Sequence, residues 1–379
     1  MILMKKTFAL VLALCLLLCG CGGKEADPTV APEATVTAPV EQTTEPAATE
    51  APATEAPETE PPVTTEAPTE APIVYRNPLN GEIVDAPFTN RIFAVSINNL
   101  KEALPHKGVY QADVFMEMFV NHSIIRGLAL YSDIASVESI GSIRSTRPIF
   151  TDIAGHYDTF VAHAGGSDEA LNDQKRSGID NMNVDTQNET DYSYRDQDRV
   201  GKYSFEHTLF AKGAGLLDTV EKKGYRITQD PDKFYGFLFT EDGTPVSGET
   251  ANSVTVSFHY RGSYKDTVMV YNEKLGGYVY NQYDMEMTDG VTGDPEVFEN
   301  VLILLGTDKL DAMGYHIFDF MGGGEGYFAC NGQIIPIRWE CAGDHEPITY
   351  YTMDGEPLYI GVGSTYMGLA ELKSKISWE

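Results

Sequence analysis

A stretch of 53 residues near the N-terminus lacks the composition needed to fold, and it sets the globular part of the chain apart from what precedes it. From Gly22 to Val74 the residues are mostly Thr, Glu, Ala and Pro, and ten of the chain's 20 prolines lie there. Such a segment buries too little apolar surface to offset its ordering entropy. Regular prolines and like-charged glutamates favour an extended chain, so we expect residues 21–74 to be a disordered stalk.

The residues before the stalk have the pattern of an export signal. Two lysines are followed by an apolar run from Phe8 to Leu18, which is shorter than the ~20 residues of a transmembrane helix. The run ends in Leu18-Cys19-Gly20-Cys21, which resembles a bacterial lipobox. We therefore expect a signal peptide over residues 1–20 and a lipid on Cys21. The protein would then lie at the extracytoplasmic face of the cell membrane. An ordinary secretory signal with a chance cysteine is the alternative.

The charge of the chain excludes some classes of partner. Of the net charge of −29, residues 75–379 carry −21, since residues 1–21 carry +2 and the stalk carries −10. A domain this acidic lacks the positive surface that binds nucleic acid or anionic lipid. It would also repel anionic wall polymers unless a local basic site or a bridging cation intervened. The expected contacts are the membrane, through the lipid, and a cell-wall component or envelope protein.

Two cysteines remain in the globular part, Cys330 and Cys341. An exported protein can form a disulfide, but Asn331-Gly332 is a strong hairpin signal that makes Gln333 the cross-strand neighbour of Cys330. Cys341 would then lie eight residues along the return strand, about 26 Å away at ~3.3 Å per residue. A disulfide needs Cα atoms within about 7 Å, so we expect two free, buried thiols.

The length of the globular part, 305 residues, suits two domains better than one. We expect a mixed α/β domain over residues 75–228 and a β-rich, mostly antiparallel domain over residues 229–379, which makes the fold class α+β. The expected strands are 92–97, 114–120, 124–131, 159–163, 253–260, 267–272, 278–283, 300–305 and four or five more within 315–368. The expected helices are 146–156, capped by Ser145 or Thr146, then one capped by Ser167 that runs to about Lys175, and 208–223; residues 176–204 are expected to form a long loop.

Signatures of familiar enzyme classes are missing from the sequence. There is no Gly-x-Ser-x-Gly elbow, no Ser-x-x-Lys and no phosphate-binding loop. His345-Glu346 lacks the second histidine of a zinc protease motif, and Asn181 to Asp185 lacks the glycine and the final acidic residue of a calcium loop. We expect no metal and no cofactor.

Two strand-to-helix turns hold the strongest candidates for a site. In Gly141–Pro148, Arg144 and Arg147 combine forked donors with free backbone amides, which suits a carboxylate or phosphate; the alternative is that they pair with acidic neighbours. In His163–Ser167, a histidine at a strand end precedes glycines that admit close backbone approach; the alternative is a structural histidine. Loops at one end of a sheet converge, so we predict one anion-accepting cleft formed by residues 96–99, 141–148 and 163–167.

The candidate residues fall into two groups. Glu117 and Arg126 lie on facing strands of the predicted hairpin and form either a cross-strand ion pair or part of the same site. The candidate ligand-binding residues are Asn98, Asn99, Glu117, Arg126, Arg144, Arg147, Gly165, Gly166 and Ser167. The candidate catalytic residues are His163 and His207.

Several of these motifs resemble a known family as a set. Asn98-Asn99-Leu100, Gln111-Ala112-Asp113, the Gly141–Pro148 turn and His163–Ser167 are similar to the YerB-type lipoproteins, whose two domains have no assigned function. The resemblance extends through Thr292-Gly293, Asn300-Val301, Gly324-Glu325-Gly326, Asn331-Gly332, Trp339, Asp354-Gly355 and Gly363. Where the family pattern has Pro-His-Asn-Leu this chain has Glu206-His207-Thr208-Leu209, and Met287 replaces a histidine before Asp-x-x-Thr-Gly. The resemblance implies a lipoprotein of the cell envelope and supplies no reaction.

Two classes of function fit the sequence. The first is a binding or assembly protein of the cell envelope with an anion-accepting cleft in the first domain. The second is an enzyme that acts on an envelope glycan, peptide or phosphodiester, using His163 or His207 with the arginines. Convergence of the arginines and histidines in one pocket would favour an enzyme or small-ligand site, whereas scattered salt bridges would favour a scaffold.

Overall fold

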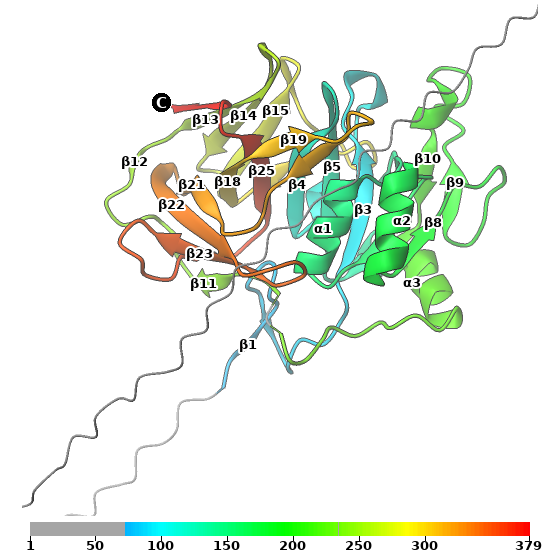
Figure 1. Cartoon of the computed structure of the whole chain (residues 1–379), viewed down its shortest axis with the longest axis horizontal. Helices are drawn as coiled ribbons and strands as arrows, with labels where there is room; N and C mark the ends of the chain where they lie inside the picture. Colours follow the sequence, from blue (N-terminus) through cyan, green and yellow to red (C-terminus); the bar gives the residue numbers. More distant parts are fainter. Residues whose placement is uncertain (1–72, 234) are drawn as a thin grey trace, which may run out of the picture. The chain divides into compact units, whose positions relative to one another are not determined.

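The computed structural model describes residues 73–233 and 235–379, and its main element is an eleven-stranded mixed sheet that runs through both halves of the sequence (Figure 1). Its central strand β25 pairs in parallel with β18 on one side and with β4 on the other. In spatial order the strands are β12 (Glu249–Thr250), β22 (Gln333–Cys341), β21 (Gly324–Cys330), β18 (Asn300–Gly306), β25 (Thr365–Glu371), β4 (Val114–Asn121), β5 (Ile124–Tyr131), β3 (Phe93–Asn98), β7 (Phe160–His163) and β8 (Asn181–Asn183), with β23 (Ile348–Thr352) beside β22.

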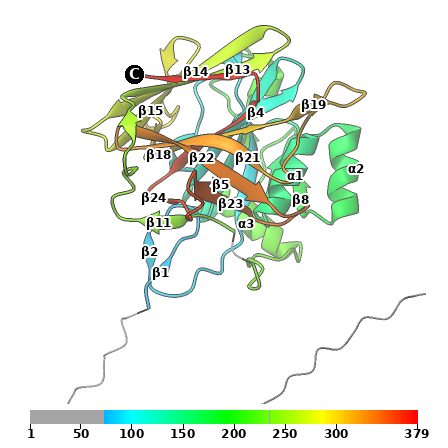
Figure 2. The ribbon, with the colours of Figure 1, turned by 60° about the vertical axis from the view of Figure 1, so that its left-hand side comes forward.

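One face of this sheet packs against a second, antiparallel sheet of six strands (Figure 2). Alternate residues of β13, Val254, Val256 and Phe258, are buried against Phe115 and other apolar side chains of the large sheet. The strands of the second sheet are β16 (Met285–Glu286), β15 (Gly277–Gln282), β14 (Ser263–Asn272), β13 (Ser253–Tyr260) and β26 (Lys375–Trp378), with β17 (Val297–Phe298) beside β15.

Two helices cover the other face, α1 (Pro148–His156) and α2 (Asp168–Ser177) (Figure 1). Ile149 and Ile153 of α1 pack onto Leu128 of the sheet. The Ser167 hydroxyl accepts a hydrogen bond from the Ala170 amide, which confirms the predicted cap of α2. The predicted cap of α1 is wrong: the helix begins at Pro148, two residues later than expected, and Arg147 is its N-cap without a side-chain hydrogen bond.

The remaining elements are short. The third helix, α3 (Gly213–Lys222), packs beside Ile134 and Val137 and buries Leu216 and Val220 in the same apolar cluster. The other strands pair as β1 (Tyr75–Arg76) with β2 (Ile83–Val84), β6 (Ile140–Gly141) with β10 (Leu209–Ala211) and β9 (Ser193–Arg195), β11 (Leu238–Thr240) with β24 (Tyr359–Gly361), and β19 (Asp308–Leu310) with β20 (His316–Phe318). Single 3-10 turns are η1 (Lys101–Ala103), η2 (Val109–Gln111), η3 (Ile134–Ser136) and η4 (Phe205–His207).

The α+β fold class is confirmed, and three local expectations are corrected. Residues 176–204 contain the short strands β8 and β9 as well as loop. The predicted helix over 208–223 begins only at Gly213, because residues 209–211 form β10, which pairs with a strand on each side. Six strands, two of them parallel to a neighbour, are formed by residues 316–371, where four or five antiparallel strands were expected.

The two cysteines are free and buried, as expected. Cys330 pairs with Gln333 across a turn in which Asn331 and Gly332 have φ angles of 50° and 72°. Positive φ at both central residues is the geometry that Asn-Gly favours in a two-residue hairpin. Burial raises the pKa of the Cys330 thiol to about 12, so this sulfur stays protonated.

Candidate functional site

Several of the residues singled out in the sequence meet where β3 ends and β5 begins. Asn98 and Arg126 are directly opposite one another in the β3–β5 register, so their side chains share the face that α1 and α2 cover. Residues 142–144 run alongside β3, with Asn98 N donating to Ser142 O at 2.8 Å and Arg144 N donating to Ser96 O at 2.9 Å. This backbone pairing brings the turn before α1 to the end of the strand.

Three arginines, Arg126, Arg144 and Arg147, form what we call the arginine cluster. Arg126 is only 3% exposed, and its Nη1 donates to Ser145 O at 2.5 Å. Arg147 donates to Thr146 O at 2.7 Å and lies 5.2 Å from the centre of the Tyr315 ring. Arg144 has one carboxylate nearby, Glu206 at 3.8 Å. Among residues 73–233 and 235–379, no ion pair involves Arg126 or Arg147, so pairing with acidic neighbours does not account for the cluster.

The electrostatics of the cluster are unfavourable without an anion. Burial lowers the pKa of Arg126 well below its ordinary value, and the charges of Arg147 and Arg144 lower it further. Burial also lowers the pKa of Arg147, and the charge of Arg144 lowers it further. The positive end of α1 begins at the same place. A bound anion would relieve the repulsion and restore ordinary pKa values to the guanidiniums.

His207 is the histidine that lies beside the cluster. The amide Nδ2 of Asn98 is 2.6 Å from His207 Nδ1, and His207 Nε2 is 3.8 Å from Glu206 Oε1. Burial lowers the pKa of His207, with Glu206 acting in the opposite direction. An amide donor to Nδ1 places the ring proton on Nε2, so the neutral ring presents a donor on the side of Glu206.

His163, by contrast, is used structurally. Its Nδ1 is 2.8 Å from Gly165 O and its Nε2 is 3.1 Å from Asn181 Oδ1, so both ring nitrogens have partners. Burial lowers the pKa of His163. The ring ties the turn after β7 to β8, which is the structural alternative stated for this residue.

The turn at 163–167 nevertheless lies against the arginine turn. Ala164 N donates to Arg144 O at 2.9 Å, and Thr146 N donates to Gly165 O at 2.9 Å. Gly166 forms a bridge with Thr146, and Ser167 caps α2. The predicted segments 141–148 and 163–167 are therefore adjacent, but the polar groups of the second hold the first in place.

Glu117 and Asn99 lie on the opposite face of the sheet, so the predicted ion pair between Glu117 and Arg126 is wrong. Arg126 pairs with Met118, because the β4–β5 register shifts between Phe119 and Asn121. One extra residue in β4 forms a β-bulge, and a one-residue shift turns a side chain to the other face. Without the shift, Arg126 would share a face with Glu117.

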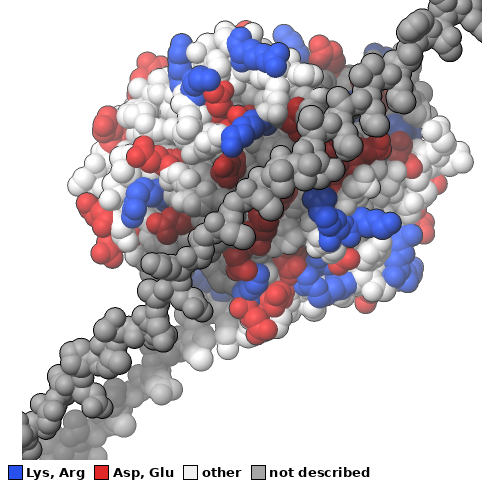
Figure 3. Space-filling model, viewed as in Figure 1, with Lys and Arg blue, Asp and Glu red and all other residues white. Residues whose placement is uncertain are grey.

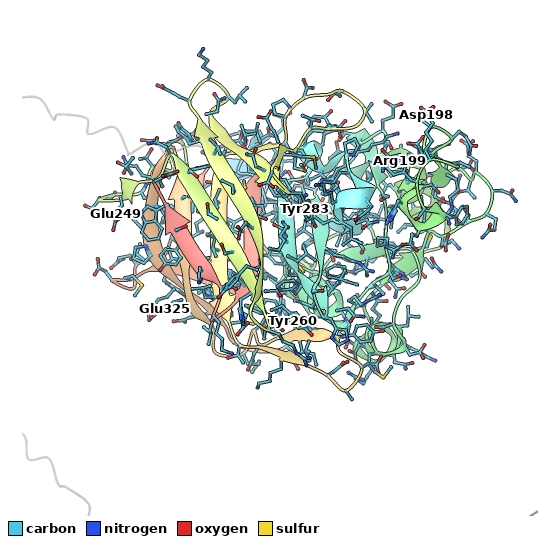
Figure 4. The ribbon with its side chains drawn as sticks, turned by 90° about the horizontal axis from the view of Figure 1, so that it is seen from above. Asp198, Arg199, Glu249, Tyr260, Tyr283 and Glu325 are labelled. Carbon is cyan, nitrogen blue, oxygen red and sulfur yellow. The ribbon has the colours of Figure 1, made fainter. Side chains whose placement is uncertain are left out.

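Glu117 is instead the centre of a buried polar group that we call the Glu117 cluster. The carboxylate is fully buried and accepts hydrogen bonds at 2.6–3.2 Å from four neutral side chains, and it also contacts a lysine ammonium. The other members are Asn99, Lys265, Thr267, Tyr280 and Tyr366. These residues join the large sheet to the six-stranded sheet, where Figure 4 places Tyr283, whose hydroxyl donates to Asn99 O at 2.8 Å.

Sequence reasoning missed the partners of Glu117 because they lie up to 249 positions away in the chain. The available signal was Lys265, a charged residue that shares one face of its strand with Thr267 and Met269, both buried. Lys265 and Tyr283 also line a cavity of about 830 Å³ on the six-stranded sheet.

Comparison with known proteins agrees with the family resemblance. Residues 79–226 match the protein of unknown function (DUF3048) N-terminal domain, and residues 254–367 match the corresponding C-terminal domain. The chain belongs to this family, which confirms the resemblance stated from the sequence.

The family includes one curated relative and one solved structure that are similar to this chain. "Putative lipoprotein YerB" of Bacillus subtilis (strain 168) is 26% identical over 268 residues, which cover 69% of this chain and 77% of the relative. The crystal structure of the YerB protein from Bacillus subtilis matches with a TM-score of 0.67 at 24% identity and covers 80% of this chain and 99% of that one. The similarity to this crystal structure shows that the two chains share a fold.

Two further observations bear on location. In the described part of the chain, no helix is long and apolar enough to cross a membrane. Figure 3 shows acidic and basic side chains interspersed on one face of the molecule. The expected signal peptide, the lipid site Cys21 and the stalk up to residue 72 lie outside the described residues.

Proposed function

We propose that this protein is a lipid-anchored binding protein on the extracytoplasmic face of the cell membrane, whose arginine cluster binds an anionic group of a cell-wall component or an envelope protein. The observation that carries the proposal is Arg126, a guanidinium 3% exposed that has two arginine neighbours and no ion pair with any described residue. Keeping three like charges together is costly unless a ligand uses them.

The chemistry of the cluster fits carboxylates and phosphates. Guanidinium groups present planar forks of donors that match two oxygens at once, and hydrogen bonds between charged groups are about twice as strong as neutral ones. The Nε atoms of Arg144 and Arg147 lack a hydrogen-bonding partner among described residues. A local basic site is also what an acidic domain needs in order to approach an anionic polymer.

An enzyme acting on an envelope glycan, peptide or phosphodiester is the second candidate, and one observation favours it. His207 has a neutral ring positioned by Asn98, and it lies beside Glu206 and Arg144. A histidine next to an anion-binding arginine can move a proton at a bound substrate. Turnover of wall fragments that is lost in His207→Gln, with binding retained, would favour this candidate.

The test of the binding function is the substitution Arg147→Gln. It removes one charge-assisted hydrogen bond, worth about 1.5–3 kcal/mol, so the affinity for phosphate-bearing or carboxylate-bearing wall fragments should fall by roughly 10- to 150-fold. Isothermal titration at low salt, with inorganic phosphate and with solubilised wall fragments, measures the change.

The matched control for this experiment is Arg338→Gln. Arg338 lies on β22 and is 4.0 Å from Glu340, and its loss removes the same charge far along the sheet from the cluster. We expect this variant to bind as the unchanged protein does. If both variants bind the anionic probes equally weakly, the loss of affinity is an effect of net charge alone. If Arg147→Gln binds with unchanged affinity, the proposed site is contradicted.

The anchor has its own test. Cys21→Ser removes the thiol that the lipobox would acylate, so the protein should lose a labelled fatty acid and leave the membrane fraction. Cys330→Ser is the control, because Cys330 is buried and its variant should keep the label. Label that persists in Cys21→Ser would show that the anchor is elsewhere.

A further inference from the structure

A cavity of about 360 Å³ lies where α1 and α2 meet residues from the second half of the chain. Its walls come from α1, from the end of α2, from β19 and β20 with the residues that follow, and from residues 344–345. Cavities of this size accommodate small ligands. The arginine cluster does not line this cavity.

The polar part of the wall is dominated by carboxylates, Asp152, Asp173, Asp319 and Asp344. Asp173 pairs with Arg176, whose side chain is 74% exposed. Asp152, in the middle of α1, makes no side-chain hydrogen bond and no ion pair with any residue of the described ranges. Asp152 is half-buried, and carboxylates held in a cleft beside other carboxylates are candidates for functional sites.

A second observation comes from the neighbouring residue. Thr151 is 2% exposed and lines the same cavity, and its hydroxyl has no hydrogen-bonding partner among the described residues. Buried hydroxyls in native proteins nearly always have a partner. Asp152 and Thr151 together therefore offer oxygen acceptors that the protein itself leaves unsatisfied.

We propose that this cavity binds the primary ammonium group of a small organic molecule. An ammonium donates three hydrogen bonds that can be shared among the Asp152 carboxylate, the Thr151 hydroxyl and a neighbouring carboxylate. The apolar residues Ile317, Phe320 and Met321 complete the wall and suit the carbon skeleton of such a molecule.

The donor set does not point to a metal ion. In residues 73–233 and 235–379, no group of three or more His, Cys, Asp or Glu side chains is arranged to hold one. Carboxylates that are spread around a cavity suit an organic cation, whose charge is distributed over several N–H donors.

The wall opposite α1 is held firmly in place. His156 Nδ1 is 2.7 Å from Glu346 O, and Lys233 Nζ donates to His345 O at 3.2 Å. The His345 ring packs directly over Gly155, where a Cβ would lie 2.1 Å from His345 Cδ2. The site is therefore preformed, and Gly155→Ala would displace the His345 wall.

Protonation of Asp152 links the binding of the ammonium to pH. Burial, together with the charges of Asp173 and Asp344, raises the pKa of Asp152 to about 7, and Arg176 acts in the opposite direction. The other charged or titratable groups on the wall are Asp319, Lys309, His345 and His156, and burial lowers the pKa of His156. An ammonium binds the ionised carboxylate, so affinity should be full above pH 7 and fall about tenfold from pH 8 to pH 6.

The experiment is isothermal titration of the protein with paired probes. Butylammonium is compared with butanol, and glucosamine with N-acetylglucosamine, so that each pair differs in the ammonium. We expect binding of at least one of the two amine probes, about tenfold weaker binding of butylammonium at pH 6 than at pH 8, and no binding of either neutral probe. Preference for glucosamine would point to an amino sugar, and preference for butylammonium to a linear amine.

Substitutions in the cavity wall, with one control on α3, test whether this cavity is the site that binds the amine probes. Asp152→Asn should abolish the pH dependence and weaken binding at least about tenfold, as loss of a charge-assisted hydrogen bond implies. Asp218→Asn removes the same charge from an exposed pair on α3 and should leave the binding of the amine probes unchanged. If Asp152→Asn does not fold, Gly155→Ala provides the second test, because it displaces the His345 wall and should also weaken binding.

The proposal fails if neither charged probe binds at about 10 mM, a concentration that detects affinities near −3 kcal/mol. It also fails if neutral probes bind equally well, or if Asp152→Asn keeps full affinity and the same pH dependence.

Discussion

Replacement of Glu117 by glutamine should lower the free energy of unfolding by about 3–5 kcal/mol, which is the usual cost of removing one partner from a buried ion pair. Glutamine has the shape of glutamate, but it carries no charge, so Lys265 would be left as an unpaired ammonium in the interior. Burial already lowers the pKa of Lys265, and Glu117 is the main group that raises it. Guanidinium unfolding followed by the fluorescence of the buried Trp339 measures the effect.

The double variant Glu117→Gln/Lys265→Met is the decisive comparison. It removes both charges, so it should be less destabilised than Glu117→Gln alone, because no uncompensated charge remains. The exposed pair of Asp218 and Lys222 provides the control, since solvent screens this pair and Asp218→Asn should leave the free energy of unfolding nearly unchanged. A Glu117→Gln variant as stable as this control would show that the Glu117 cluster does not hold the two sheets together.

Replacement of Asp152 by asparagine should act in the opposite direction and stabilise the protein at alkaline pH. The folded-state pKa of Asp152 is about 7, above the value of roughly 3.9 in an unfolded chain. The folded state therefore holds a proton that the unfolded state has released, and stability falls as pH rises from about 4 through 7. Asparagine never ionises, so at pH 8 the variant should be more stable by up to about 4 kcal/mol.

The pH dependence distinguishes this effect from a simple change of packing. Below about pH 4, aspartic acid is neutral in both states, so the advantage of Asp152→Asn should disappear there. Urea unfolding at pH 4.5 and pH 8 measures the two differences in unfolding free energy. The same difference at both pH values would mean that Asp152 is not the group that titrates near neutrality.

The elements predictable from the sequence are those whose signals are local. The β4–β5 hairpin follows from two apolar runs and a short turn, and α2 follows from Ser167 and the acidic residues after it. Strand β10 was missed because its apolar residues fit a helical stripe equally well, and only pairing with β6 and β9 decides between the two. The parallel pairing of β25 with β4 was missed because it joins residues about 250 positions apart, and no local pattern indicates such a pairing.

The candidate site divides in the same way. Arg144 and Arg147 could be identified because a strand-to-helix turn has a recognisable sequence, and they lie together as expected. The side of the sheet on which Arg126 lies depends on the β-bulge in β4, and no local sequence pattern predicts this bulge. The partnerless Asp152 could not be identified at all, because an aspartate inside a helix looks like a solvent-facing residue until the segments around it are in place.

The central position of β25 has a consequence for how this chain can reach its native state. Synthesis proceeds from the N-terminus, and domains tend to fold as they emerge. The strand that covers the free edge of β4 comes from residues 365–371, about 250 positions later in the chain. Until then, the first family domain exposes the backbone donors and acceptors of an apolar strand, which is a template for pairing with other chains. A nascent or truncated chain that lacks residues 365–371 is therefore vulnerable to aggregation, and β25 acts as the closing element of the N-terminal half.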